Sequence, residues 1–212
     1  MSQFSERVLT GQVALYPVTM QSSPLAWAIA LAQMPKLLRG TYHPLYHAAP
    51  VWVVDEPVDL PYLGRMLAPG AYTVDATALG LVATRIDSQS RAGATIALRD
   101  VPPTVRHSIK ESAIAERARC WHARNIGRVM YDRRRLLRFL WRLPLDWLPL
   151  KVPKKARSVL LRTVCSSYTS LSTYKVFSYD DVPRYAAFWT TPSDLGRTRE
   201  LYTVTAELRL VS

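Results

Sequence analysis

Histidine side chains are the first candidates for chemistry in this sequence. His43 and His47 lie in a segment, residues 40–50, whose Gly and Pro content predicts a loop. A histidine pair beside bound RNA could act as general acid and base for cleavage at a 2′-hydroxyl, and Tyr42 and Tyr46 could assist. Loop histidines more often make structural hydrogen bonds only, so catalysis is the weaker interpretation of this pair.

The two cysteines are weaker candidates for catalysis or metal binding than the histidines. Cys120 and His122 fall two positions apart on a predicted helix, and side chains at that spacing do not share a face. The pair is therefore poorly placed for a Cys–His nucleophile. A zinc site built from Cys120, His122 and Cys165 would lack any C-x-x-C element. We therefore expect no metal and no cofactor, and a binding function rather than a catalytic one.

Positive charge is concentrated in one part of the chain. The 212 residues have a formal net charge of +12, and residues 106–162 contain 12 Arg and 4 Lys against four acidic residues. This one segment therefore accounts for the whole net charge. Such asymmetry indicates a polyanionic partner, for which RNA, DNA and an anionic membrane surface are the candidates.

The basic residues also follow a helical period. Residues 109–142 predict a long helix, with one interruption near Gly127, and six of its arginines fall within a sector of about 80°. Such a ridge could follow a phosphate backbone. The residues expected to contact nucleic acid are these six arginines and three basic residues that follow them: Arg117, Arg124, Arg128, Arg135, Arg138, Arg142, Lys154, Lys155 and Arg157.

Two other interpretations of the ridge, a solvated face and a membrane-surface helix, are less favoured. A solvated helix face normally mixes charges of both signs, whereas like charges at i,i+4 spacing repel one another. A membrane-surface helix would need its apolar face to be free, and a globular core is expected to cover that face. We therefore expect RNA and other protein subunits as partners, with target DNA as an alternative and no membrane.

The remaining elements are predicted from apolar periodicity and turn residues. Strands are expected at 7–16, 51–54, 71–75, 78–86, 94–99, 173–178 and 202–210. A helix capped by Ser23 should run to Gln33 and, being apolar nearly all round, should be buried against the sheet. A basic helix is expected over 154–171, and a turn or helix cap over 191–194. This order predicts an α+β fold, a ferredoxin-like sandwich with an inserted Arg-rich helical segment.

The opening segment supports a family comparison. Residues 13–32, Val-Ala-Leu-Tyr-Pro-Val-Thr-Met-Gln-Ser-Ser-Pro-Leu-Ala-Trp-Ala-Ile-Ala-Leu-Ala, resemble the first strand, loop and helix of RAMP-superfamily CRISPR proteins, and small type IV-like subunits in particular. The resemblance implies a ferredoxin-like (RRM-like) fold and a subunit that holds guide RNA in a ribonucleoprotein for antiviral defence. An endoribonuclease that processes the CRISPR RNA without metal is the alternative, and no catalytic residue is transferred.

The sequence also predicts how the chain is divided into regions and where in the cell the protein is located. Residues 1–105 are expected to form an N-terminal α+β portion, residues 106–170 a basic helical insertion, and residues 171–212 the strands that complete the core. The first residues lack a basic-then-apolar leader, and no apolar run approaches the roughly 18–20 residues of a membrane span. Two cysteines cannot form a disulfide scaffold, so a cytoplasmic location is expected.

Overall fold

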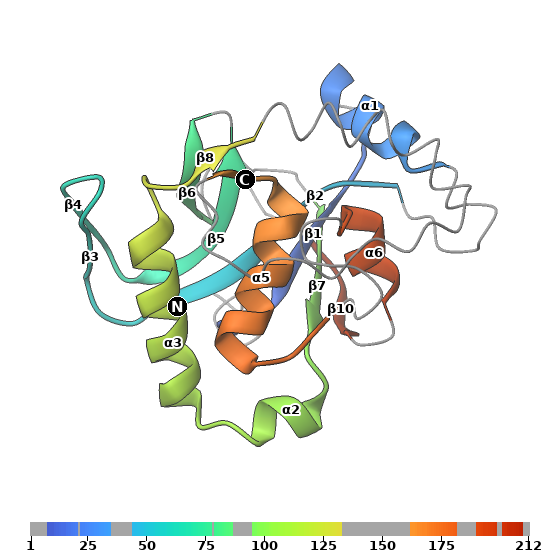
Figure 1. Ribbon diagram of the computed structural model, residues 1–212. Coiled ribbons are helices and arrows are strands. Elements are labelled where there is room, and N and C mark those ends of the chain that lie inside the picture. The colour runs from blue at the N-terminus through green and yellow to red at the C-terminus, as the bar shows by residue number, and fades with distance from the viewer. Residues whose placement is uncertain are drawn as a thin grey trace.

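The fold is built on one curved antiparallel sheet (Figure 1). A computed structural model describes residues 8–20, 22–34, 44–77, 79–86, 95–132, 162–181, 190–198 and 201–209. Within these ranges six strands pair in the order β10-β7-β1-β2-β5-β6. Their bounds are β1 Val13–Pro17, β2 Leu45–Val54, β5 Gly70–Thr77, β6 Gly80–Arg85, β7 Thr95–Asp100 and β10 Tyr202–Arg209.

The long strand β2 changes partners along its length. Residues 45–50 pair with β1, whereas residues 51–54 pair with residues 70–73 of β5. The hydrogen-bonded stretch of β2 and β5 therefore ends at Val51 and Thr73. His47 on β2 and Asp75 on β5 both lie just beyond that end, where the two strands separate.

Helices cover one face of the sheet. α3 (Glu111–Asn125) and α5 (Cys165–Phe177) pack on β2 and against each other, and α6 (Pro192–Arg197) lies beside them (Figure 1). Their buried side chains join those of the strands in one core around Trp52, which includes Ile114, Tyr168 and Leu195. The other elements are α1 (Pro24–Ala32), α2 (Pro103–His107), a hairpin of β3 (Val58–Leu60) and β4 (Arg65–Leu67), and a parallel pair of β8 (Met130–Tyr131) and β9 (Arg162–Thr163).

Several predicted elements are confirmed. The strands expected near 71–75, 78–86, 94–99 and 202–210 are present as β5, β6, β7 and β10. Ser23 caps α1 by accepting a hydrogen bond from the Ala26 N–H. Thr191 begins α6 through a capping box with Asp194, as the turn residues of that segment indicate.

The N-terminal half also departs from prediction. Residues 45–50 were expected to be loop but form the first half of β2, because β1 supplies hydrogen-bonding partners that local composition does not reveal. The predicted burial of α1 is wrong as well. Only Ala26 and Ala30 of this helix are buried, and three of its large apolar side chains, Leu25, Trp27 and Leu31, are exposed.

The helix predicted over 109–142 ends at Asn125. Ile126 leaves helical geometry and Gly127 has a φ of 77°, a conformation that favours glycine. A Cβ at Gly127 would lie 2.7 Å from the Leu63 side chain, so the close approach of the β3–β4 hairpin also requires glycine there. Residues 133–142 lie outside the described residues.

Predictions for residues 154–178 are corrected where the structure describes them. Arg162–Thr163 is a short strand instead of helix, and the expected strand 173–178 is mostly the last turns of α5. Nearly all of α5 is buried, so its sequence lacks the apolar stripe by which a surface helix is recognised. Residues 154–161 lie outside the described ranges.

The α+β class is confirmed, whereas the ferredoxin-like arrangement is not. Every neighbouring pair in the described six-stranded sheet is antiparallel, and the ferredoxin-like arrangement stays a prediction. The division into regions 1–105, 106–170 and 171–212 stays a prediction.

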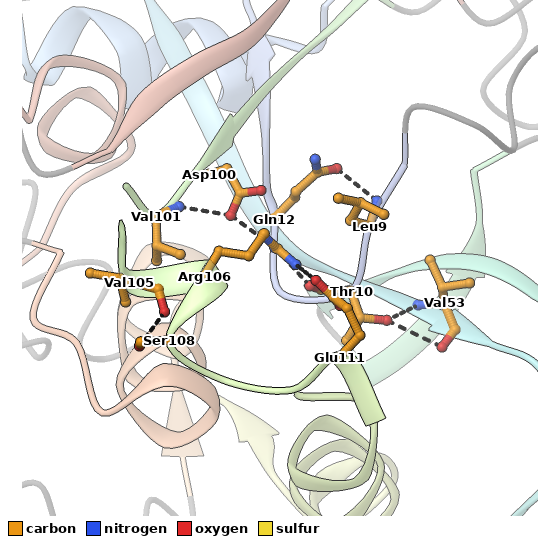
Figure 2. Close-up of polar contacts among 10 residues, drawn as sticks. All are labelled: Leu9, Thr10, Gln12, Val53, Asp100, Val101, Val105, Arg106, Ser108 and Glu111. Carbon is orange, nitrogen blue, oxygen red and sulfur yellow. Dashed lines mark hydrogen bonds and ion pairs between the residues drawn. The ribbon is translucent and has the colours of Figure 1, made fainter. Parts of the chain in front are cut away.

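A buried arginine ties the N-terminal loop to the rest of the fold (Figure 2). Arg106 of α2 donates to Asp100 at 2.8 Å and to the Thr10 carbonyl at 3.0 Å, and its guanidinium lies over the Phe177 ring of α5. Asp100 in turn accepts from the Val101 N–H at 2.7 Å. Both side chains of the ion pair are almost fully buried, so each compensates the other's loss of hydration.

We expect Arg106→Ala to destabilise the protein by about 3–5 kcal/mol, because it leaves the Asp100 carboxylate buried without its partner. Urea unfolding followed by circular dichroism measures the difference. Arg119→Ala is the control, since Arg119 pairs with Glu116 on the exposed face of α3 and should unfold like wild type. Equal stability of Arg106→Ala and wild type would contradict this role for Arg106.

Candidate active site at Cys165, His47 and Asp75

Cys165 is the first residue of α5. The preceding strand β9 pairs with β8, Tyr131 opposite Thr163, and Val164 then provides the extended residue that begins the helix. The N–H groups of a first helical turn lack intrahelical acceptors and carry partial positive charge. A thiol at this position is therefore favoured as the thiolate. Cys165 is 9% exposed, so it is sheltered and close to the surface.

His47 reaches Cys165 from β2. Its Nε2 lies 2.9 Å from Asp75 Oδ1, and the Cys165 side chain is near enough to raise the pKa of His47 through charge and hydrogen bonding. The Tyr16 and Tyr46 rings lie against the imidazole, with centroid distances of 5.1 and 6.2 Å, and restrict its rotation.

Asp75 is held by its own partners on β5 and β1. Its Oδ2 accepts a hydrogen bond from the Thr73 hydroxyl at 3.0 Å, and that hydroxyl accepts from Tyr16 at 3.4 Å. The Asp75 side chain is 3% exposed and that of His47 18%. Asp75 therefore orients the imidazole from the inner side, and the imidazole links it to the thiol.

Charge is stabilised in this cluster by mutual attraction. Burial alone would lower the pKa of His47, but the Cys165 sulfur and the hydrogen bond to Asp75 raise that pKa well above its ordinary value. Burial opposes ionisation of Cys165, yet His47 and the N–H groups of Ala48 and Ser166 lower the pKa of the thiol. The two directions agree with a thiolate–imidazolium pair at neutral pH.

Two tyrosines complete the surroundings of the sulfur. Burial raises the pKa of Tyr131 and of Tyr46, and the negative charge of Cys165 raises both further, which places both hydroxyls within electrostatic reach of the thiolate. Both phenols therefore stay protonated near neutral pH and can donate hydrogen bonds. The β8–β9 pair thus brings a donor, Tyr131, and the nucleophile, Cys165, to one place.

These groups match the requirements of nucleophilic catalysis. A nucleophile needs an adjacent base, and the base needs a third group that fixes its orientation. Here the three are Cys165, His47 and Asp75: His47 contacts Asp75 at 2.9 Å, and Cys165 and His47 shift each other's pKa toward the charged forms. Within the part of the chain that the structure describes, no cluster of three or more His, Cys, Asp or Glu is placed to hold a metal ion.

The other histidines and the second cysteine that the sequence indicates as candidates are not part of this site in the described structure. His43 lies outside the described residues, so its pairing with His47 stays a prediction. His122 is a core residue, whose Nδ1 lies 2.9 Å from the Tyr168 hydroxyl, and burial lowers its pKa to about 3. Cys120 is exposed and donates a hydrogen bond to the Glu116 carboxylate. Cys120 and His122 therefore do not form a catalytic pair, which agrees with the prediction from their helical spacing.

The arginine ridge is only partly described. Arg117 and Arg124 are exposed on α3, and Arg117 donates to the Val176 carbonyl at 3.1 Å. Arg128 follows the helix and lies over the Tyr62 ring instead of extending the ridge. The predicted contacts that lie outside the described residues are Arg135, Arg138, Arg142, Lys154, Lys155 and Arg157.

Sequence reasoning missed the site as a whole. The sequence indicates His47 as a candidate acid or base and Cys165 only as a candidate zinc ligand, and it gives no signal for Asp75. The three residues are spread over more than a hundred positions and form no local motif. The available signal is that Cys165 is one of only two cysteines in the sequence.

No family model, curated protein or solved structure matches this chain. Among the described residues, no helix has both the length and the apolar character needed to cross a membrane.

The site predicts a pH profile for alkylation. In a Cys120→Ser background, the rate of iodoacetamide modification should rise with a midpoint below the ordinary thiol pKa of about 8.5. His47→Gln, which keeps a hydrogen-bonding side chain but removes the positive charge, should move the midpoint upward, since burial then dominates. Mass spectrometry at each pH gives the rates. A midpoint at or above 8.5 that His47→Gln leaves unchanged would argue against the ion pair.

Proposed function

We propose that this protein is a cysteine-dependent acyl hydrolase or acyltransferase, acting on a carboxylic ester or amide. The observation that carries the proposal is the contact of Cys165, at a helix N-terminus, with a histidine that a buried carboxylate orients. The chemistry needs no group beyond these side chains, a substrate and water or another acyl acceptor.

The first step is attack of the Cys165 thiolate on the substrate carbonyl carbon. A carbon–sulfur bond forms and the carbonyl electrons move onto oxygen. As the intermediate collapses, the bond to the leaving alkoxide or amine breaks, and His47 transfers its proton to that group. The product of this step is a thioester on Cys165 and a neutral imidazole hydrogen-bonded to Asp75.

In the second step His47 acts as a base instead of an acid. The neutral His47 removes a proton from water, or from an acceptor hydroxyl or amine, which attacks the thioester carbon. The carbon–sulfur bond then breaks, the acyl product leaves, and the thiolate–imidazolium pair is restored. Asp75 stays ionised throughout and stabilises the imidazolium whenever it forms.

Negative charge on the carbonyl oxygen needs hydrogen-bond donors. The N–H groups of the first turn of α5, including that of Ser166, which acts on the Cys165 thiol, and the Tyr131 hydroxyl are the donors near the sulfur. Donors fixed in advance by a helix and a strand pair require no rearrangement as the charge develops. We assign oxyanion stabilisation to this group of donors.

RNA binding by a CRISPR-type subunit remains a separate proposal for the basic segment. The exposed arginines Arg117 and Arg124 on α3 support it, and the ferredoxin-like fold and RAMP relationship belong to the same proposal. It does not compete with the site, because these arginines take no part in the contacts of Cys165. An endoribonuclease role for His47 is less favoured, since His47 is committed to a thiol and a carboxylate.

The proposal predicts a covalent intermediate. Incubation of the full chain with p-nitrophenyl acetate should give a burst of p-nitrophenolate and an acetyl group on the peptide containing Cys165. Asp75→Asn should lower the acylation rate by roughly 10²–10⁴-fold, the range for loss of acid–base catalysis. Stopped-flow absorbance and peptide mass spectrometry measure the two results.

Two cysteine variants make this test decisive. Cys165→Ala should abolish both the burst and the label, whereas Cys120→Ala should keep both, because Cys120 is exposed and away from the site. Acetylation of the wild type at Cys120 alone, or an undiminished burst in Cys165→Ala, would refute the assignment.

A further inference from the structure

Asp181 carries a carboxyl group that is buried where α5 and α6 lie side by side (Figure 1). The residue is 0% exposed. Its Oδ1 accepts a hydrogen bond from the Ser170 hydroxyl of α5 at 2.5 Å. Its backbone carbonyl accepts from the hydroxyl of Thr198, the residue that follows α6, at 2.7 Å. Asp181 is therefore held between the two helices through both its side chain and its backbone.

The face of α5 that Asp181 meets is lined with hydroxyl groups. Ser166, Ser170 and Thr173 recur at i, i+4 and i+7, so they lie along one side of the helix, and all three are buried. Ser166 donates to the Thr190 carbonyl at 2.6 Å. Burial raises the pKa of Asp181, whereas hydrogen bonding by Ser170 and Thr173 lowers it. The carboxyl group therefore faces neutral oxygen atoms instead of apolar side chains.

One oxygen of this carboxyl group lacks a partner. Among the described residues, Asp181 Oδ2 has no hydrogen-bond partner, and neither has the buried Thr190 Oγ1, which lies on the same side of α5. The charged side chain that acts on Asp181 within the described ranges is that of Asp180, and this charge is also negative. Burying an ionised carboxylate without a counter-charge is costly, so buried charges are normally paired or coordinate a metal.

The charged side chains of the surrounding elements are committed to other contacts. Arg99 of β7 donates to backbone carbonyl groups in residues 195–201. Lys175 of α5 is exposed and lies over an indole ring of α3. Asp194 caps the opposite end of α6 and is itself acidic. Within the part of the chain that the structure describes, the protein therefore supplies no positive charge to Asp181.

The oxygen atoms gathered here suit a metal cation. Carboxylate and hydroxyl oxygens are ligands of hard cations. Sites with high affinity for Ca²⁺ use several carboxylates, whereas here one buried carboxylate is surrounded by neutral hydroxyls, which matches a single positive charge. We propose that the Asp181 carboxylate and the Ser170 hydroxyl bind a monovalent metal cation, Na⁺ or K⁺, between α5 and α6. This site takes no part in the proposed acyl chemistry and goes beyond it.

Thermal unfolding of the full chain in different chloride salts tests the cation site. At equal ionic strength, NaCl or KCl should raise the unfolding midpoint above that in tetramethylammonium chloride, because a ligand that binds only the folded state stabilises it. The rise should be about 5–10 °C at a cation concentration about 100 times its Kd. Circular dichroism measures the midpoints, and the comparison of NaCl with KCl identifies the preferred cation.

Three variants assign the salt effect to this site. Asp181→Asn keeps an acceptor for Ser170 but removes the charge, so the midpoint should no longer differ between the salts. Ser170→Ala removes one oxygen ligand and keeps the carboxylate, and it should weaken cation binding by about tenfold or more. The matched control, Asp59→Asn, removes the same charge from an exposed position on β3 and should respond like wild type.

Equal midpoints of the wild type in all three salts would overturn the proposal. A salt effect that both Asp181→Asn and Ser170→Ala retain in full would also overturn it, as would a rise in the midpoint with MgCl₂ or CaCl₂ alone. Cys165→Ala separates the cation site from the active site, since this variant should lose acyl chemistry and keep the wild-type response to NaCl and KCl. Equal midpoints with retained acyl chemistry in the wild type would count against the cation site alone.

Discussion

The burial of α5 against β2 is the constraint on which the rest of the structure depends. Nearly every side chain of this helix is buried, and many are Ser or Thr instead of large apolar residues. Some of their hydroxyls bond within the helix, as when Thr169 donates to the Cys165 carbonyl at 2.9 Å, and others bond to neighbouring segments, as when Ser166 donates to the Thr190 carbonyl at 2.6 Å. Small side chains let the helix approach the sheet closely. Its first residue can therefore reach the point where β2 and β5 separate.

Close packing on α5 is also visible at its other end. Gly11 has a φ of 88°, and a Cβ there would lie 2.4 Å from the Phe177 ring. The Arg106 guanidinium covers the same ring while it pairs with Asp100. The N-terminal loop, α2 and the end of β7 are thus all fitted to the C-terminal end of α5, and these contacts fix the helix along its axis.

At the N-terminal end, the same packing brings ionisable groups out of water. A carboxylate as buried as Asp75 requires a partner, and His47 and Thr73 supply it. The imidazole, held by this carboxylate and by two tyrosine rings, then stabilises a thiolate on Cys165. Each group in the series lowers the cost of burying the next. The mutual dependence favours one arrangement of the three side chains over looser alternatives.

The sequence predicts the local features of this fold better than the contacts between distant segments. Ser23 and Thr191 signal helix starts because capping is decided within a few residues, and β10 is evident from its alternation. The first half of β2 was missed because its pairing with β1 is non-local. The bounds predicted for the helix that includes Cys165 are wrong because burial on all sides leaves no apolar stripe in the sequence of α5. His47 was noted, but its partners Asp75 and Cys165 become neighbours only through the separation of β2 from β5.

The protonation of His47 is the most direct test of the central claim, that Cys165 and His47 form an ion pair. Nitrogen-15 chemical shifts of the labelled imidazole distinguish imidazolium from neutral imidazole. We predict an imidazolium at neutral pH in the wild type, and a lower His47 pKa in Cys165→Ser, because the negative sulfur is then absent. A neutral imidazole at neutral pH in the wild type, or a His47 pKa that Cys165→Ser leaves unchanged, would contradict the claim.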